Sequence, residues 1–231
     1  MTLKEFSEAL KKRNIEIDQE MLERFDVYAK YLKEYNEKIN LTAITEYEQV
    51  LDKHFYDSLL LVDRDLEGTL VDVGSGAGFP GVVLKIVFPK LKVILLEPIK
   101  KRCVFLESLI EKLDLKDIEV VCDRAEDYSL KHREEYDYVT ARAVSNLNGL
   151  IEVCGAMVRL DGYFICLRGK DGLEEIEVAS KAINTMGFEI ESIKKENIFS
   201  GDNRVISYFK KVTKSPIKYP RKYNIIKKNP L

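Results

Sequence analysis

A glycine-rich segment, VDVGSGAGFPG at residues 71–81, carries the clearest chemistry in the sequence. Three glycines directly follow its apolar residues: Gly74, Gly76 and Gly78. A buried apolar run that ends in glycines is typical of a parallel strand at whose carboxyl end an α/β protein binds its ligand. Glu97 ends the next apolar run, about 20 residues later, where a carboxylate accepts hydrogen bonds from ribose hydroxyls. The segment therefore predicts a site for an adenosine-containing cofactor.

Two residues of the segment bear on which cofactor that is. The dinucleotide fingerprint G-x-G-x-x-G requires a glycine where this chain has Phe79. Asp72 precedes the loop, and its carboxylate would repel a pyrophosphate but could contact a cationic ligand. S-adenosylmethionine carries a sulfonium and an ammonium and no phosphate, so it fits better. An NAD(P)-dependent oxidoreductase stays open as the alternative, because the strand–glycine–helix unit and Glu97 suit it as well.

Two further strand ends carry polar residues. The segment CDRAED (122–127) follows a predicted third strand at 118–122, and its acidic groups or backbone amides would lie beside the adenine. The segment TARAV (140–144) ends a predicted fourth strand at 136–142. Arg142 is therefore expected on the reactive side of the cofactor.

The residues near the fourth strand end also limit the methyl acceptor. Exocyclic amines of bases are usually served by an Asn- or Asp-Pro-Pro-aromatic loop there, and this chain has no proline at that place. Carbon methylation of pyrimidines needs a cysteine nucleophile, usually after proline, whereas Cys154 and Cys166 fall on core-like positions. An acceptor with its own lone pair, such as guanine N7, needs no base. Elimination therefore favours guanine N7.

The elements that must position these groups alternate regularly. The first 67 residues contain no glycine or proline, and apolar residues from Met21 to Ile39 recur at helical spacing. From residue 69 onward, apolar strands alternate with helices, which predicts an α/β fold with a mostly parallel sheet. The last two strands, near 188–196 and 204–211, have a short connection, so one of them should run antiparallel at the sheet edge.

Composition excludes several other classes of protein. The chain has 231 residues, of which 45% are hydrophobic and 33% charged, so it is not a disordered tail protein. No apolar run is long enough to span a bilayer, and the charged N-terminus does not resemble a signal peptide, so a cytoplasmic protein is expected. Four scattered cysteines and two histidines predict no metal site. Residues 210–231 hold eight basic residues and no acidic one, which favours a local polyanion contact.

With these motifs in view, the sequence resembles the bacterial small-subunit (16S) ribosomal RNA guanine-N7 methyltransferase family, RsmG, also called GidB. The resemblance runs from about Asn40 to the C-terminus. Besides the glycine segment, it is carried by six segments: Asn40-Leu41-Thr42, His54 with Asp57-Ser58-Leu59, KKRCVFL (100–106), RAED (124–127), TARAV (140–144) and the tail KYPRK…KKNPL.

The resemblance implies a class I S-adenosylmethionine-dependent methyltransferase fold. This fold is Rossmann-like, with a seven-stranded mostly parallel sheet, and here it would carry an N-terminal helical extension. We expect the extension at residues 1–65, the cofactor-binding domain at 66–212 and a basic tail at 213–231. The implied donor is S-adenosylmethionine, and the implied acceptor is N7 of a guanine in the decoding region of 16S ribosomal RNA. A monomer acting on this RNA or on the small ribosomal subunit is expected.

Residue roles follow from the same resemblance. Carried over by position, the cofactor contacts are Gly74, Phe79, Ala125, Glu126 and Arg142, with Glu97 on the ribose; Asp72, Gly76 and Gly78 of the glycine segment complete the expected set. The residues expected on the substrate side are Asn40, His54, Asp57 and Ser58. Arg142 and Asn40 would hold guanine and cofactor in line, with His54 as a positioning donor. The candidate phosphate contacts are Lys38, Lys170, Arg204, Lys218, Arg221 and Lys227.

A third reading also stays open from the sequence. The chain could be a non-catalytic RNA-binding module that keeps a methyltransferase scaffold. The intact glycine segment together with Glu97 speaks against it.

Overall fold

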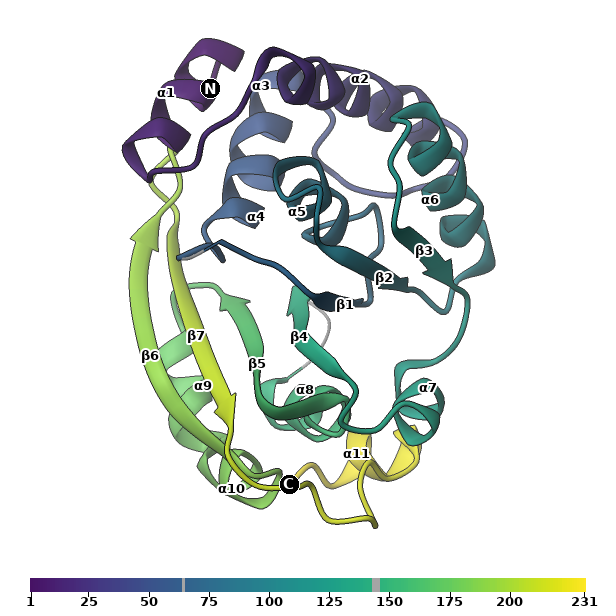
Figure 1. Cartoon of the computed structure of the whole chain (residues 1–231), viewed down its shortest axis with the longest axis vertical. Helices are drawn as coiled ribbons and strands as arrows, with labels where there is room; N and C mark the ends of the chain where they lie inside the picture. The colour runs from purple at the N-terminus through teal and green to yellow at the C-terminus, as the bar shows by residue number, and fades with distance from the viewer. Residues whose placement is uncertain (64, 143–145) are drawn as a thin grey trace.

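A seven-stranded sheet with the order β3-β2-β1-β4-β5-β7-β6 runs through the molecule (Figure 1). The computed structural model describes residues 1–63, 65–142 and 146–231. The strands are β1 (Thr69–Val73), β2 (Lys92–Leu96), β3 (Ile118–Val121), β4 (Tyr136–Arg142), β5 (Val158–Arg168), β6 (Phe188–Asn197) and β7 (Asn203–Lys211). The first five are parallel to one another, and β7 is antiparallel to both of its neighbours. The predicted α/β class is confirmed, as are the strands predicted before Gly74, before Glu97, at 118–122, at 136–142 and near 188–196 and 204–211.

The order of the last two strands corrects one prediction. The antiparallel strand is β7, which lies between β5 and β6, so it is not at the sheet edge as expected. Residues 205–209 of β7 are all buried, whereas most of β6 alternates between exposed and half-buried positions. The more apolar strand takes the inner position because its two faces are both covered there.

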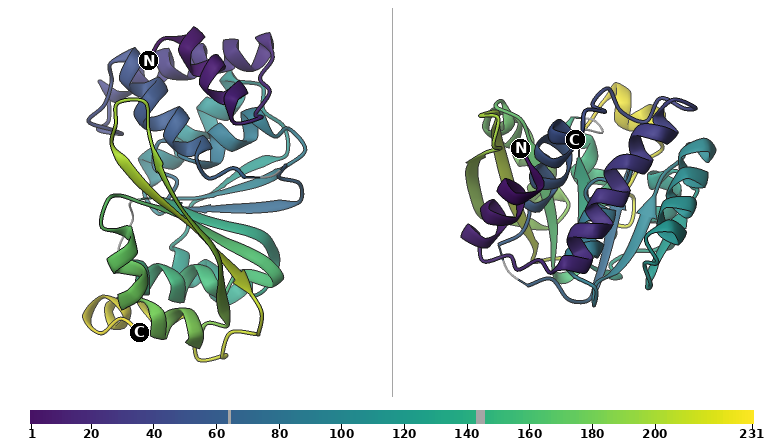
Figure 2. Two further views of the ribbon diagram at one scale, coloured as in Figure 1. Left: turned by 90° about the vertical axis from the view of Figure 1, so that its left-hand side faces the viewer. Right: turned by 90° about the horizontal axis from the view of Figure 1, so that it is seen from above.

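Helices cover both faces of the sheet (Figure 2). On one face lie α1 (Leu3–Lys12), α2 (Gln19–Asn36), α3 (Tyr47–Val50), the π-helical segment η1 (Leu51–Tyr56), α4 (Asp57–Leu59), α5 (Gly81–Val87) and α6 (Lys100–Lys112). On the other lie α7 (Ala125–Lys131), α8 (Leu147–Gly155), α9 (Gly172–Val178), α10 (Ser180–Thr185) and α11 (Tyr223–Lys228). Alternation along β1 separates the two layers, since Leu70 packs with the first set and Val71 with the second.

The N-terminal helices share their hydrophobic core with the rest of this layer. Phe25, Tyr28 and Leu32 of α2 are fully buried in one cluster with Val82 of α5 and Phe105 of α6. The helical extension is thus packed directly against the helix that follows the glycine segment. The N-terminal helices therefore help to hold the segment that carries the glycine loop.

Two classes of feature are absent from the part of the chain that the structure describes. No described helix is long and apolar enough to cross a membrane. No three described His, Cys, Asp or Glu side chains are grouped as a metal ion would require.

Candidate cofactor and substrate site

The glycine loop between β1 and α5 is a tightly held turn. Gly74, Gly76 and Gly78 all have positive φ, at 73°, 57° and 97°. A Cβ at Gly78 would lie 2.6 Å from the hydroxyl oxygen of Tyr28, which itself donates a 2.5 Å hydrogen bond to the carbonyl of Ala77. Helix α2 therefore fixes the shape of the loop, and only glycine fits where it presses.

Glu97 joins this loop to the one that follows β2. Its Oε2 accepts a hydrogen bond of 2.9 Å from the backbone N–H of Gly76, and its Oε1 accepts one of 2.9 Å from Ile99. The carboxylate is almost fully buried. Arg102 Nη1 lies 3.9 Å from Oε2, and each oxygen has the second lone pair that a bond from a ribose hydroxyl would require.

A pocket of about 380 Å³ opens at the carboxyl ends of β1 and β2. Gly74, Ala125 and Glu126 line it, as the sequence predicted for cofactor contacts. Its other walls are mainly apolar, with Val73 and Leu96 among them. Apolar walls around a glycine backbone fit the adenosine part of S-adenosylmethionine.

Asp72 lies behind the loop and does not line this pocket. It is fully buried, and its Oδ2 accepts a 2.9 Å hydrogen bond from the backbone N–H of Gly81. Its Oδ1 has no hydrogen-bond partner among the described residues, and the Ser75 hydroxyl donates to the backbone carbonyl of Asp72. Burial raises the pKa of Asp72 to about 7, while the Gly81 N–H opposes that shift. An incompletely paired buried carboxylate suits a cationic ligand acting through its charge, without the direct contact that the sequence suggested.

The substitution Asp72→Asn should raise the stability of the protein and weaken its binding of the cofactor. Because the folded pKa lies above 3.8, the native state holds the extra proton, and the free energy of unfolding falls as pH rises from 3.8 to 7. The uncharged amide of the variant has no such penalty, so at pH 8 the variant should unfold at a higher urea concentration. Affinity for S-adenosylmethionine should rise through pH 7 in the wild type, stay flat in the variant, and be about tenfold weaker in the variant at pH 8. Glu8→Gln, which changes an exposed carboxylate, is the control and should behave like the wild type. If Asp72→Asn and the wild type bind S-adenosylmethionine with equal affinity and equal pH dependence, the Asp72 charge has no role in binding the cofactor.

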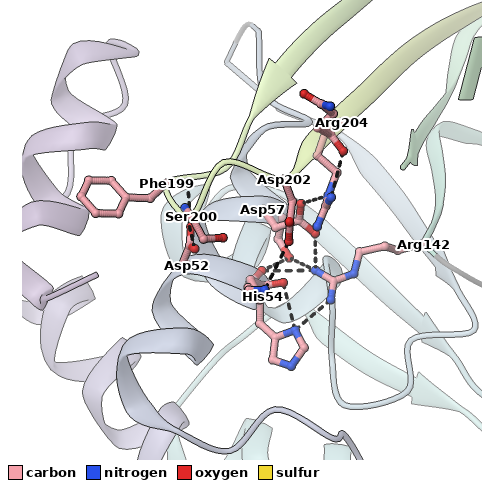
Figure 3. A network of polar contacts seen from close by, with 11 residues as sticks. Asp52, His54, Asp57, Arg142, Phe199, Ser200, Asp202 and Arg204 are labelled. Carbon is pink, nitrogen blue, oxygen red and sulfur yellow. Dashed lines mark hydrogen bonds and ion pairs between the residues drawn. The ribbon is translucent and has the colours of Figure 1, made fainter. Parts of the chain in front are cut away.

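A second, polar pocket of about 620 Å³ is lined by residues that include His54, Asp57 and Arg142. Two guanidiniums converge there on one buried carboxylate (Figure 3). Arg142, at the end of β4, lies 3.1 Å from Asp57 Oδ2, and Arg204, on β7, donates a 2.5 Å hydrogen bond to Asp57 Oδ1. Burial raises the pKa of Asp57, and the two guanidiniums oppose that shift. The cluster brings together three of the predicted site residues from α4, β4 and β7.

His54 connects this pocket to the glycine loop. Its ring stacks on Phe79 with centroids 4.3 Å apart, and the Arg142 guanidinium lies 5.2 Å over the same Phe79 ring. A guanidinium can only donate, so His54 Nδ1 accepts from Arg142 at 2.9 Å, and the ring proton on Nε2 is donated to Thr42 Oγ1 at 2.9 Å. Burial and Arg142 lower the pKa of His54 to about 3. The imidazole is therefore neutral at physiological pH and positions Arg142.

Sequence reasoning missed the residue that fixes the outer rim of the polar pocket. Asp52 is buried in η1 and accepts hydrogen bonds of 2.8 and 3.0 Å from the backbone N–H groups of Phe199 and Ser200 (Figure 3). Lys53 and Asp202 add an ion pair of 3.2 Å. These contacts hold the β6–β7 turn beside the pocket and so orient Arg204. The sequence separation of these partners is too large for any local signal to have shown them.

Several predicted residues lie elsewhere. Asn40 is exposed and is not among the described residues that line the polar pocket; Thr42, two positions later, makes the contact with His54. Ser58 is not among the described residues that line the polar pocket, but it is fully buried next to Arg142, from which its hydroxyl accepts a 3.4 Å hydrogen bond while it donates to the carbonyl of His54. The last two residues of the predicted TARAV segment, at 143 and 144, lie outside the described residues.

The candidate phosphate contacts divide into three groups. Arg204 pairs with Asp57 in the polar pocket. Arg221 directs its guanidinium to the fully buried Glu152, with hydrogen bonds of 2.9 and 2.6 Å. Nε and Nη2 of Arg221 are therefore directed into the protein, so we expect this residue to contribute less to phosphate binding than an exposed cation. Four lysines of the set are exposed: Lys38, Lys170, Lys218 and Lys227.

Known proteins of the same fold place this site in context. A methyltransferase from Aquifex aeolicus described as S-adenosylmethionine-dependent is similar to this chain with a TM-score of 0.55 and 18% identity, covering 76% of this chain and 97% of its own. The M. jannaschii TYW2 complex with AdoMet gives a TM-score of 0.55 at 14% identity over 68% of this chain and 75% of its own. The architecture is thus the class I methyltransferase fold.

Sequence comparison is more specific. The family model of rRNA small subunit methyltransferase G matches residues 21–201. A protein of Acetivibrio thermocellus with the name ribosomal RNA small subunit methyltransferase G is 45% identical over 94% of this chain and 91% of its own length. The Bacillus subtilis protein of the same name is 41% identical over 100% of this chain and 99% of its own length. The chain belongs to the rRNA small subunit methyltransferase G family.

Proposed function

We propose that this chain transfers the methyl group of S-adenosylmethionine to N7 of a guanine in the decoding region of bacterial 16S ribosomal RNA. One observation carries the proposal: a polar pocket large enough for a base adjoins the glycine loop through Phe79 and Arg142. The names of the relatives support ribosomal RNA of the small subunit as the substrate.

The donors in the polar pocket suit guanine. Guanine O6 accepts hydrogen bonds, and the guanidiniums of Arg142 and Arg204 are paired donors held rigid by Asp57. Donation to O6 fixes the base in its plane and leaves the N7 lone pair free to attack. The expected contribution of these residues is therefore orientation.

The reaction needs no base from the protein. N7 attacks the methyl carbon as the carbon–sulfur bond breaks, and the purine gains the positive charge that the donor loses. His54 has its Nδ1 lone pair occupied by Arg142 and is not available as a base. S-adenosylmethionine supplies the activated methyl group when bound, and Glu97, Gly74 and Asp72 are the residues that we assign to holding it.

The exposed lysines extend the substrate site into an RNA surface. Lys38, Lys170, Lys218 and Lys227 are separate positions from which phosphate contacts are expected. Each contact that is lost should flatten the salt dependence of RNA affinity by about one unit of slope. We propose that the protein acts as a monomer in the cytoplasm on 16S RNA or on the small ribosomal subunit.

Labelled transfer tests the function directly. Purified protein with methyl-labelled S-adenosylmethionine is mixed with 16S RNA and with intact small subunits from cells lacking this gene. About one methyl group per RNA molecule is expected on at least one substrate, and none on RNA from cells that keep the gene. No label on either substrate would contradict the proposal, and protection of the protein from heat by NADH alone would revive the oxidoreductase reading.

A further inference from the structure

The basic C-terminal tail forms part of the pocket that we assign to the cofactor. Helix α11 contributes three of the residues that line the cavity of about 380 Å³: Tyr223, Ile226 and Lys227. Ile226 is buried, whereas Tyr223 is 45% exposed. In Figure 1 the helix lies beside α7 and α8, the helices that form the opposite walls. The tail therefore lines the cavity that we assign to the cofactor, a place that RNA binding alone would not require.

Arg124 connects α11 to the segment that follows β3. Its guanidinium lies 4.8 Å over the Tyr223 ring, and its Nε donates a 2.7 Å hydrogen bond to Glu126 Oε1. Glu126 and the intervening Ala125 line the same cavity. One side chain thus contacts both the start of α7 and the start of α11.

Several contacts along the tail hold α11 in this place. Lys211 and Arg133 fix the segment near Ser215, because Lys211 donates to the Ser215 hydroxyl and Arg133 donates a 3.1 Å hydrogen bond to its carbonyl. Arg221 is paired with buried Glu152 immediately before α11. After α11, Asn148 of α8 donates a 2.7 Å hydrogen bond to the carbonyl of Leu231. The helix is therefore anchored on both sides against α8.

We infer that α11 is the wall against which the adenine ring of the cofactor binds, with Tyr223 and Ile226 in contact with the base and Arg124 positioning Tyr223. An aromatic ring and a branched aliphatic side chain match the two apolar faces of a purine, and loss of one such stacking contact typically costs affinity. The inference rests on the proposed function, since it takes the cavity to be the adenosine site. It gives the tail a role in cofactor binding that is independent of RNA.

Calorimetry without RNA tests this role. The probes are S-adenosylhomocysteine and 5′-methylthioadenosine, the second of which keeps the adenosine and lacks the amino acid. Tyr223→Ala and Ile226→Ala should each raise the Kd of both probes by about tenfold. Tyr223→Phe should bind like the wild type, because it keeps the ring. Ile225→Ala is the matched control, since Ile225 lies on the same helix, is exposed and does not line the cavity.

The outcomes separate the two claims. A wild-type protein that binds neither probe contradicts the proposed function. A wild-type protein that binds both, with Tyr223→Ala and Ile226→Ala unchanged in Kd, overturns the role of α11. Weaker RNA binding by these variants with unchanged Kd for both probes also overturns it. The thermal midpoint of each ligand-free variant shows whether a loss of affinity is caused by unfolding. Tyr223 is 45% exposed, so Tyr223→Ala should leave the fold intact.

Discussion

Replacing Arg142 with Ala is expected to lower kcat for methyl transfer by about a hundredfold, the usual cost of removing one preorganised donor from an active site. Arg142 contacts Asp57, His54 and the Phe79 ring, so it links the polar pocket to the glycine loop. In the proposed arrangement its loss would leave guanine O6 with one donor instead of two, and among the described residues it leaves Asp57 with Arg204 as its ion-pair partner. Single-turnover transfer to small subunits measures the effect without contributions from product release.

Arg142→Lys is the matched control for charge. Lysine keeps one positive charge but cannot donate in a fork to Asp57 and His54, so it should recover only a minor part of the lost rate. The Kd for S-adenosylhomocysteine and the thermal midpoint show whether the pocket is still formed. A single-turnover rate within threefold of the wild type in Arg142→Ala would remove this residue from the catalytic residues.

Arg221→Ala should lower the free energy of unfolding by about 3 kcal/mol, because it leaves a carboxylate buried without its partner. Glu152 is fully buried in α8, and it accepts hydrogen bonds from Nε, Nη2 and the backbone N–H of Arg221. The slope of RNA affinity against salt concentration should stay nearly the same, since the charge of Arg221 is already balanced by Glu152. Urea unfolding measures the first effect and binding at several salt concentrations measures the second.

Two comparisons isolate the pair. Lys222→Ala removes a neighbouring exposed charge and should leave the unfolding free energy nearly unchanged. Glu152→Gln in the Arg221→Ala background should recover most of the lost stability, because no buried charge then remains. A double variant as unstable as Arg221→Ala would contradict the buried-charge explanation, and a salt slope flattened by about one unit would restore Arg221 as a phosphate contact.

Local sequence pattern was sufficient for most of the fold. The apolar runs before Gly74 and Glu97 and the run that ends at Arg142 are the strands β1, β2 and β4. The spacing of apolar residues within one segment shows which of its faces is buried, so it predicts individual helices and strands well. The order of β6 and β7 in the sheet depends on which of the two strands is the more deeply buried, and a pattern within one strand does not give that comparison.

The site was predicted in part. Residues at strand ends, such as Arg142, could be placed because parallel strands share one edge. The partners that hold them come from distant parts of the chain, as Asp52 does for the β6–β7 turn and Tyr28 for the glycine loop. The ion pair of Arg221 could not be predicted, since sequence does not distinguish a surface cation from one paired with a buried carboxylate. These contacts exist only in the folded chain.

Mapping the methylated atom tests the central claim most directly. The 16S RNA from cells lacking this gene is treated, as naked RNA and as intact small subunits, with the protein and methyl-labelled S-adenosylmethionine, then digested and analysed by mass spectrometry. The account predicts one new N7-methylguanine, located in the decoding region, and a strongly reduced amount with Arg142→Ala. Label on another atom or another base would contradict the assignment of guanine N7 as the acceptor.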